Sequence, residues 1–280
     1  MAFDIYAAVT DRIIRQLEAG CIPWQKPWGG IEGGAISGAT GKSYSLLNQM
    51  ILGKPGMYFT FNQIQNLGGH IRKGEKSQMV VFWKQIPMKE QNPQTGEQCE
   101  KLIPILRYYS VFHLNQTEGL NITPTEAPKN PTTHTRAEEI ISEYLRRSGM
   151  ELQHRIGDEA YYSPAADQVV LPMMEQFNSS AEYYSTAFHE LTHSTGHRSR
   201  LDRLRGTVYF GNESYSKEEL VAEIGAAALM NYVRLENTST LRNSTAYIQS
   251  WLKVLKNDKR LIINASGAAS KAVEYIITTS

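Results

Sequence analysis

Apolar residues recur at helical spacing at the start of the chain. Their positions are Ile5, Val9, Ile13, Ile14 and Leu17, and Gly20 follows as a residue that commonly ends a helix. A helix is therefore predicted over residues 4–19. Similar patterns and capping residues predict further helices over residues 44–51, 61–66, 135–147, 243–255 and 268–277, after Ser179, and around residues 215–226.

Strand patterns occupy two separate parts of the chain. Runs rich in β-branched and aromatic residues predict strands over residues 57–60, 78–84 and 106–112, and again over residues 160–162 and 168–171. Residues 89–100 are polar and contain Asn92-Pro93 and Thr95-Gly96, which are typical of turns. We therefore expect an exposed hairpin excursion between the second and third of these strands.

A polar segment separates the two parts. Residues 121–135 contain three prolines and several threonines but few apolar residues, which is typical of a linker. We expect two domains, residues 1–120 and residues 136–280, and we expect residues 1–130 to fold alone. The mixture of helices and short strands predicts the α+β class, with a small α/β domain first.

The clearest chemical pattern is His-Glu-x-x-His at residues 189–193. Side chains four residues apart share one face of a helix, so His189 and His193 can present two imidazole nitrogens to one metal ion. Glu190 lies beside the first histidine and can act as a general base toward water. An alternative for the same residues is a pair of surface histidines with a solvated glutamate.

A zinc site of this kind needs a third protein ligand, and the next predicted helix offers two carboxylates. Ser199 stands where a third histidine is found in related motifs, and His197 comes two residues too early. We favour Glu219 as the ligand and Glu223 as the residue that orients a ligand histidine, while the reverse assignment stays open. Helix capping together with Ser216 is another possible role of Glu219.

Aromatic and basic residues alternate in the first domain as they do in proteins that bind single-stranded nucleic acid. Trp24, Lys26 and Trp28 lie in a segment with two prolines, so the rings are candidate platforms for base stacking beside a phosphate contact. Tryptophans that simply cover a core are the alternative. Further candidate DNA contacts are Lys42, Tyr44, Asn48, Arg72, Lys73, Lys76, Lys84 and Arg107.

The net charge does not by itself indicate nucleic-acid binding. The 280 residues include 29 basic and 28 acidic side chains, for a net charge of +1. Residues 1–130 hold 13 basic and 10 acidic side chains, a difference of +3, and the remainder holds 16 and 18, a difference of −2. This mild asymmetry permits a local basic groove in the first domain.

Nothing in the sequence indicates secretion or membrane insertion. The two cysteines, Cys21 and Cys99, are too few for a disulfide scaffold. The first residues lack a basic region followed by an apolar run, and no apolar stretch approaches ~18 residues. We therefore expect a cytoplasmic protein with no membrane partner.

Several segments together resemble one known family. Residues 189–200 read His-Glu-Leu-Thr-His-x-x-Gly-x-x-x-Arg, and with residues 215–223 and 247–252 they resemble the zincin-like metallopeptidase domain of ArdC-type antirestriction proteins. Residues 13–28, 69–76 and 111–120 resemble the single-stranded-DNA-binding domain of the same family. The resemblance covers nearly the whole chain and implies an antirestriction role with single-stranded DNA as partner.

The expected function combines both patterns. We expect an antirestriction protein that binds single-stranded DNA and carries a zinc metallopeptidase-like site, with Zn²⁺ held by His189, His193 and Glu219, or another divalent ion such as Mn²⁺ in its place. One alternative is a zinc metallopeptidase whose first domain recognises an unknown protein substrate. Another is a DNA-binding module in which the metal is only structural.

Overall fold

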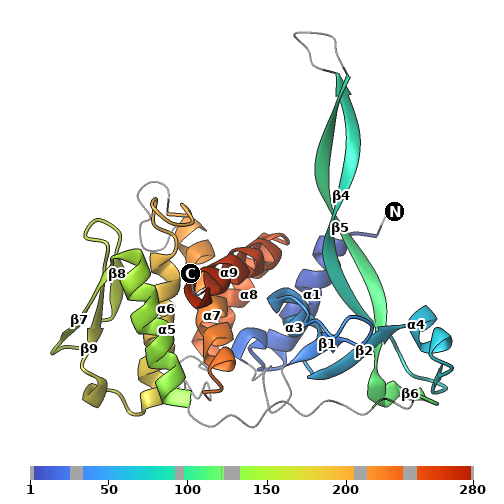
Figure 1. Ribbon diagram of the computed structural model, residues 1–280, viewed down its shortest axis with the longest axis horizontal. Helices are drawn as coiled ribbons and strands as arrows, with labels where there is room; N and C mark the ends of the chain where they lie inside the picture. The colour runs from blue at the N-terminus through green and yellow to red at the C-terminus, as the bar shows by residue number, and fades with distance from the viewer. Residues whose placement is uncertain are drawn as a thin grey trace.

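The computed structural model describes residues 3–25, 34–91, 98–120, 122, 133–204, 213–235 and 245–278. It places a sheet with a long two-stranded ribbon at one end, a group of helices in the middle and a smaller sheet at the other end (Figure 1). The predicted α+β class is therefore confirmed. Among the helices described, none has the length and apolar character needed to span a membrane.

The first half is built on a sheet with the strand order β1-β2-β5-β4. Its strands are β1 (Ala35–Ser37), β2 (Gly56–Thr60), β4 (Gln78–Gln91) and β5 (Gln98–His113). Around it lie α1 (Ile5–Glu18), η1 (Pro23–Gln25), α3 (Leu46–Leu52), α4 (Phe61–Asn66), η2 (Leu114–Gln116) and the strand pair β3 (His70–Ile71) and β6 (Thr117–Glu118). The helices predicted over residues 4–19, 44–51 and 61–66 are confirmed.

Strands β4 and β5 are longer than predicted. They pair antiparallel from Gln78 opposite Val111 to Gln91 opposite Gln98, and the ribbon projects away from the sheet (Figure 1). Residues 89–91 and 98–100 continue the two strands, so the hairpin excursion predicted over residues 89–100 starts as an extension of this ribbon, while residues 92–97 lie outside the described residues. A ribbon that is exposed on both faces accepts polar residues throughout, and the alternation that identifies a strand is then lost.

The second half combines a small sheet with long helices. The sheet has the order β7-β9-β8 and consists of β7 (Glu151–Arg155), β8 (Tyr161–Ser163) and β9 (Gln168–Pro172), with η3 (Met174–Gln176) after it. The helices are α5 (Thr133–Ser148), α6 (Ser180–Ser194), α7 (Glu213–Tyr232), α8 (Thr245–Asn257) and α9 (Leu261–Ile277). Strand β7 was not predicted because Leu152 is its only apolar residue.

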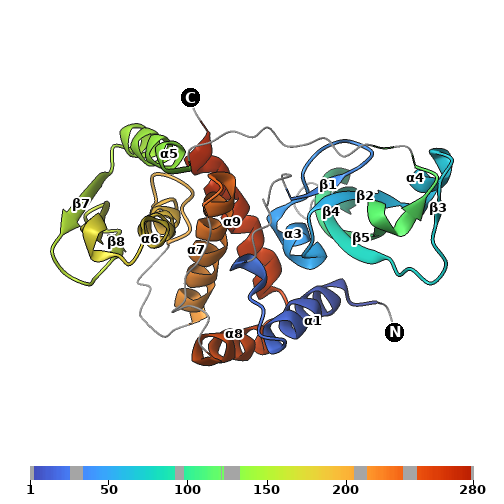
Figure 2. The same cartoon turned by 90° about the horizontal axis from the view of Figure 1, so that it is seen from below.

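Helix α7 contributes to two hydrophobic cores and lies with α9 in the middle of the molecule (Figure 2). One core joins α6 and α5 to α7 and includes Tyr144, Phe188 and Leu229. The other joins α1 and η1 to the helices of the second half. Its members include Val9, Ile13, Trp24, Leu220, Ile224, Leu255 and Ile262.

This second core argues against the expectation that residues 1–130 fold alone. The Trp24 ring packs edge to face against Trp251, with 5.9 Å between the ring centroids. The Thr10 hydroxyl also donates a hydrogen bond to the Lys259 carbonyl at 2.7 Å. The start of the chain therefore covers helices of the second half. Of the predicted linker, residues 121 and 123–132 lie outside the described residues, and residues 133–135 begin α5.

Candidate metal centre

Helices α6 and α7 pack closely enough to share one site. Ser179 begins α6 by accepting a hydrogen bond from the Glu182 amide at 3.2 Å. At the contact with α7, a Cβ atom added to Gly225 would lie 2.6 Å from the Thr192 side chain. Only glycine permits this close approach, which brings the carboxylates of α7 against the last turns of α6.

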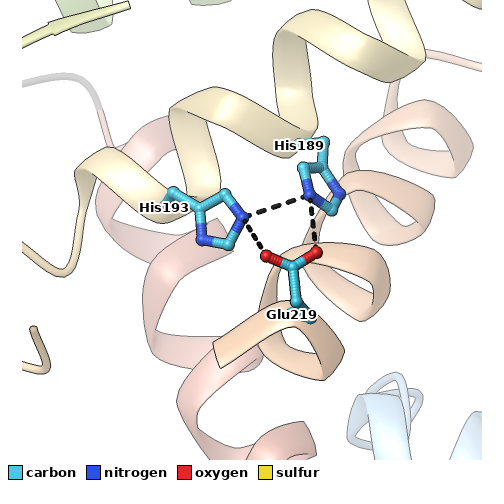
Figure 3. A group of neighbouring side chains, drawn as sticks. All are labelled: His189, His193 and Glu219. Atoms are coloured by element: carbon cyan, nitrogen blue, oxygen red, sulfur yellow. Dashed lines mark hydrogen bonds and ion pairs between the residues drawn. The ribbon is translucent and has the colours of Figure 1, made fainter. Parts of the chain in front are cut away.

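The three predicted metal ligands converge at this contact (Figure 3). His189 Nε2 lies 3.1 Å from His193 Nε2, and the two oxygens of Glu219 lie 3.6 Å from His189 Nε2 and 3.4 Å from His193 Nε2. Ligand atoms about 2.0–2.1 Å from one tetrahedral ion are about 3.3 Å apart. Two imidazoles and a carboxylate therefore fit one divalent ion both in chemistry and in spacing.

The electrostatics of this cluster favour a positive charge at its centre. Burial lowers the pKa of His193, but hydrogen bonds to Glu218 and Glu219 outweigh burial and raise the pKa to about 10. Burial raises the pKa of Glu219, but interactions with His189 and His193 outweigh it and hold the pKa of that carboxyl well below its usual range. The carboxylates of Glu218 and Glu219 therefore stabilise positive charge at the two histidines, and a metal cation bound there would meet the same favourable field.

Glu223 lies behind His189 and not among the converging atoms. Its Oε1 is 3.9 Å from Nδ1 of His189, the ring nitrogen that does not face Glu219. This Nδ1 is buried, and it has no hydrogen-bond partner within the described part of the chain. The arrangement supports Glu219 as the ligand and Glu223 as the carboxylate that orients His189.

Glu190 is buried at a cavity of about 390 Å³ that reaches the ligand cluster. The remaining wall of the cavity is formed by Ala160, Tyr161, Tyr162, Pro164, Leu204 and Glu218. The tyrosines come from β8, which is an outer strand of its sheet. A substrate in this cavity would therefore lie next to both the ligand cluster and the candidate general base.

Glu218 belongs to the site although the sequence pattern does not single it out. Its Oε1 lies 3.5 Å from Nδ1 of His193 and accepts a hydrogen bond from Arg203 Nη2 at 2.8 Å. The signal for it in the sequence is indirect. A carboxylate beside the ligand glutamate needs a cation if it is buried, and arginines follow the His-Glu-x-x-His motif within a few residues.

Arg200 fixes the strand pair that forms the rim of the cavity. It donates hydrogen bonds to the Ser194 carbonyl at 2.7 Å and to Asp167 Oδ2 at 3.0 Å, and Asp167 also accepts one from the Tyr162 hydroxyl at 2.7 Å. The bonds from Arg200 lower the pKa of Asp167. His197 Nδ1 lies 3.9 Å from Asp167 Oδ2, so this histidine belongs to the same network and not to the ligand cluster.

Two of the candidate DNA contacts are wrong. Trp24 is fully buried in the core and cannot stack on a base. Asn48 is buried too, and its side-chain amide exchanges two hydrogen bonds of 2.8 Å with the backbone of Val81, which joins α3 to β4. Tryptophan and asparagine can both contact DNA, but here both side chains are buried and make contacts within the protein. Lys26 and Trp28 lie outside the described residues.

The remaining candidates lie on three segments. Lys42 is exposed and Tyr44 half-buried after β1, and Arg72, Lys73 and Lys76 are exposed between β3 and β4. Lys84 and Arg107 are exposed on the ribbon, and the strand register puts both on the face that carries Tyr109. The rings of Tyr109 and Phe82 stack with 4.7 Å between centroids. Basic and aromatic side chains thus occur together on the ribbon.

Comparison with known proteins identifies two regions of the chain. Residues 3–112 match the N-terminal domain of the anti-restriction factor ArdC, and residues 137–268 match a zincin-like metallopeptidase domain. Two crystal structures of the antirestriction protein ArdC from plasmid R388 are similar to this one. The metal-free form is 37% identical and the Mn(II)-bound form 35%, each with a TM-score of 0.75 over 98% of this chain and 97% of that chain.

Curated relatives contain a similar sequence in proteins of different length. A DNA primase TraC of Escherichia coli is 34% identical over 97% of this chain, yet the match covers only 20% of that protein. The chain thus spans about a fifth of that relative. The protein y4eC of Sinorhizobium fredii (strain NBRC 101917 / NGR234) is 32% identical, and the match covers 98% of this chain and 91% of y4eC. With both regions matched and a solved relative aligned over almost its full length, the chain belongs to the ArdC-type antirestriction family.

Proposed function

We propose that this protein protects incoming DNA from restriction, binds single-stranded DNA through its first half and hydrolyses a peptide bond at a zinc site in its second half. One observation carries the hydrolytic part of this proposal. Three ligand atoms converge beside a buried glutamate at the wall of a cavity. Because incoming DNA meets restriction enzymes inside the cell, the proposal includes a cytoplasmic location.

The roles of the residues follow from their positions. His189, His193 and Glu219 would hold the ion, which when bound supplies Lewis-acid chemistry. Glu190 follows His189 on α6 and faces the cavity, so it is placed to take a proton from water as that water attacks a carbonyl. Tyr161 and Tyr162 would flank the substrate, which we propose to be a protein or peptide.

Zinc is the ion that this donor set favours. Two imidazoles and one carboxylate form a borderline-soft site with room for a further ligand, as in catalytic zinc sites. Mn²⁺ is the alternative, because the R388 ArdC structure contains Mn(II).

The DNA-binding part is supported by the family of the first half and by the ribbon. Lys84, Arg107 and Tyr109 combine two cations with an exposed ring on one face, as surfaces for single-stranded nucleic acid do. Lys42, Tyr44, Arg72, Lys73 and Lys76 stay in the proposal as further contacts. Trp24 and Asn48 are removed from it because both are buried.

The variant Glu190→Gln tests the proposal, because it keeps the shape of the side chain and removes the base. The wild type should contain about one divalent ion per chain and cleave a protein substrate. Glu190→Gln should keep its metal, thermal stability and single-stranded-DNA affinity but lose hydrolysis. We expect protection against restriction to survive in this variant, because covering DNA requires no turnover. A wild-type protein that binds no divalent ion would refute the metal site.

A further inference from the structure

A buried ion pair connects the two helices of the metal centre. The side chains of Arg203 and Glu218 are only 14% and 11% exposed. Arg203 Nη2 donates to Glu218 Oε1 at 2.8 Å, and Arg203 Nε donates to Oε2 at 3.2 Å. Such a two-point contact fixes the plane of the carboxylate as well as its distance.

Arg203 also binds the end of α6. Nη1 donates to the Thr195 hydroxyl at 2.8 Å, and Nη2 also donates to the Thr192 carbonyl at 2.9 Å. A Cβ atom on Gly196 would come within 3.2 Å of Arg203 Nη2 and 2.9 Å of Leu204, so glycine leaves the space that the guanidinium needs. The loop after the motif is therefore shaped to place Arg203 between α6 and α7.

The carboxylate held in this way faces a metal ligand. Glu218 Oε1 lies 3.5 Å from Nδ1 of His193, while Nε2 of the same ring faces His189 and Glu219. A proton on Nδ1 that is directed at Glu218 leaves the lone pair of Nε2 free for a metal ion. Arg203 contacts the buried Glu218 carboxylate at two points and so compensates its desolvation.

We infer that the Arg203–Glu218 pair positions His193 for metal binding, so that both residues are positioning residues of the metal centre. This inference rests on the proposed metal site. Glu218 selects the tautomer and the ring orientation of His193, and Arg203 acts only through Glu218. The two carboxylates that neighbour Glu219 in the site thus have parallel roles: Glu223 lies behind His189, and Glu218 lies behind His193.

The test compares zinc affinity in the full-length protein by competition with a chelator. Glu218→Gln keeps the size of the side chain and should weaken zinc binding about 10- to 100-fold, as loss of an orienting carboxylate does. Arg203→Ala should weaken it in the same range. The double variant should bind zinc about as tightly as whichever single variant has the lower zinc affinity, because the two residues act as a unit.

A spectroscopic measurement separates positioning from a loss of folding. In zinc-loaded protein, the Nδ1 proton of His193 should give a slowly exchanging NMR signal, and this exchange should become faster in Glu218→Gln. Arg200→Gln is the control within the same loop, since Arg200 is also buried, with 2% of its side chain exposed, but binds Asp167. It should lower thermal stability and leave the zinc affinity of the folded protein unchanged.

Three results would overturn the inference. The first is a folded Glu218→Gln variant that binds zinc as tightly as the wild type. The second is a double variant in which the losses of zinc affinity caused by Arg203→Ala and Glu218→Gln add. If Arg203→Ala does not fold, Arg203→Lys takes its place, because lysine keeps the charge but not the two-point contact. The third overturning result is a folded Arg203→Lys variant in which both the zinc affinity and the exchange of the His193 Nδ1 proton are unchanged. Failure of the wild type to bind zinc would refute the proposed function itself, whereas these outcomes leave it intact.

Discussion

The metal centre and the β4–β5 ribbon differ in how their functional side chains are held. His189 and Glu219 stand on two helices that are packed on their other sides, and their side chains are 9% and 26% exposed. Tyr109 and Tyr108 are 56% and 45% exposed on a ribbon that extends from the body of the molecule (Figure 1). One region encloses its side chains between packed helices, and the other presents side chains to solvent.

This difference in side-chain exposure and support matches what each region is proposed to bind. A metal ion requires ligand atoms at set distances, so its ligands need support from a rigid core and from neighbouring ion pairs. Single-stranded DNA is flexible and varies in sequence, and a surface of rings and cations that adjusts to it is sufficient. The two regions can therefore be altered separately, except where the shared core supports both.

The largest effect is expected from removing that shared core. In residues 1–130 alone, Val9, Ile13, Leu17 and Trp24 would lose the core partners that α7, α8 and α9 supply, and each large apolar side chain left in water costs about 1.5–3 kcal/mol. Since whole domains are stable by only about 5–15 kcal/mol, this fragment should not fold stably. Circular dichroism and amide NMR spectra should show a largely unfolded chain. Folding should be restored by adding residues 131–280, and a cooperative unfolding transition of the isolated fragment would contradict this expectation.

The next effect concerns the metal ligands. Glu219→Ala removes a ligand atom and should lower metal affinity by more than the roughly 10- to 100-fold typical of an orienting residue. Glu223→Ala should stay within that smaller range, because Glu223 lies behind His189. Metal analysis and chelator competition on both purified variants measure the difference. The opposite order would make Glu223 the ligand.

The convergence of His189, His193 and Glu219 could be predicted from sequence because it depends on helical periodicity. A spacing of four residues places His189 and His193 on one face, and the same rule pairs Glu219 with Glu223. The Arg203–Glu218 pair does not follow from any period. It depends on the path of residues 195–204, which Gly196 and a left-handed backbone at Asp202 (φ 51°) make possible.

The first half was harder to predict because its polar and aromatic residues have two possible uses. A tryptophan between prolines suits base stacking and core packing equally, and only the position of α7 and α8 shows that Trp24 is buried. Asn48 is similar, since its role depends on Val81 of a distant strand. Such contacts join residues far apart in the chain, and local patterns contain no information on them.

On the ribbon, two adjacent tyrosines provide a matched pair of variants. Tyr109 shares its face with Lys84 and Arg107, whereas Tyr108 lies on the opposite face, with its ring 5.0 Å from that of Phe3. Tyr109→Ala should weaken single-stranded-DNA binding by about 1–3 kcal/mol if the ring stacks on a base. Tyr108→Ala should have little effect. Fluorescence anisotropy with a labelled oligonucleotide measures both, and equal losses would show that the ribbon has no preferred DNA face.

The smallest effect is expected in the salt dependence of DNA binding. Arg107 is exposed on the proposed DNA face, so its contact with a phosphate would release a counterion. Arg107→Gln should reduce the slope of log affinity against log salt by about 0.7, the value for one phosphate of a single strand. Arg72→Gln should change the slope less, because Arg72 already binds Glu75 at 3.0 Å. Binding titrations over a range of salt concentrations give both slopes. An unchanged slope for Arg107→Gln, with Tyr109→Ala still weakening binding, would mean that the ribbon contacts bases and that the phosphates are bound by the other basic segments.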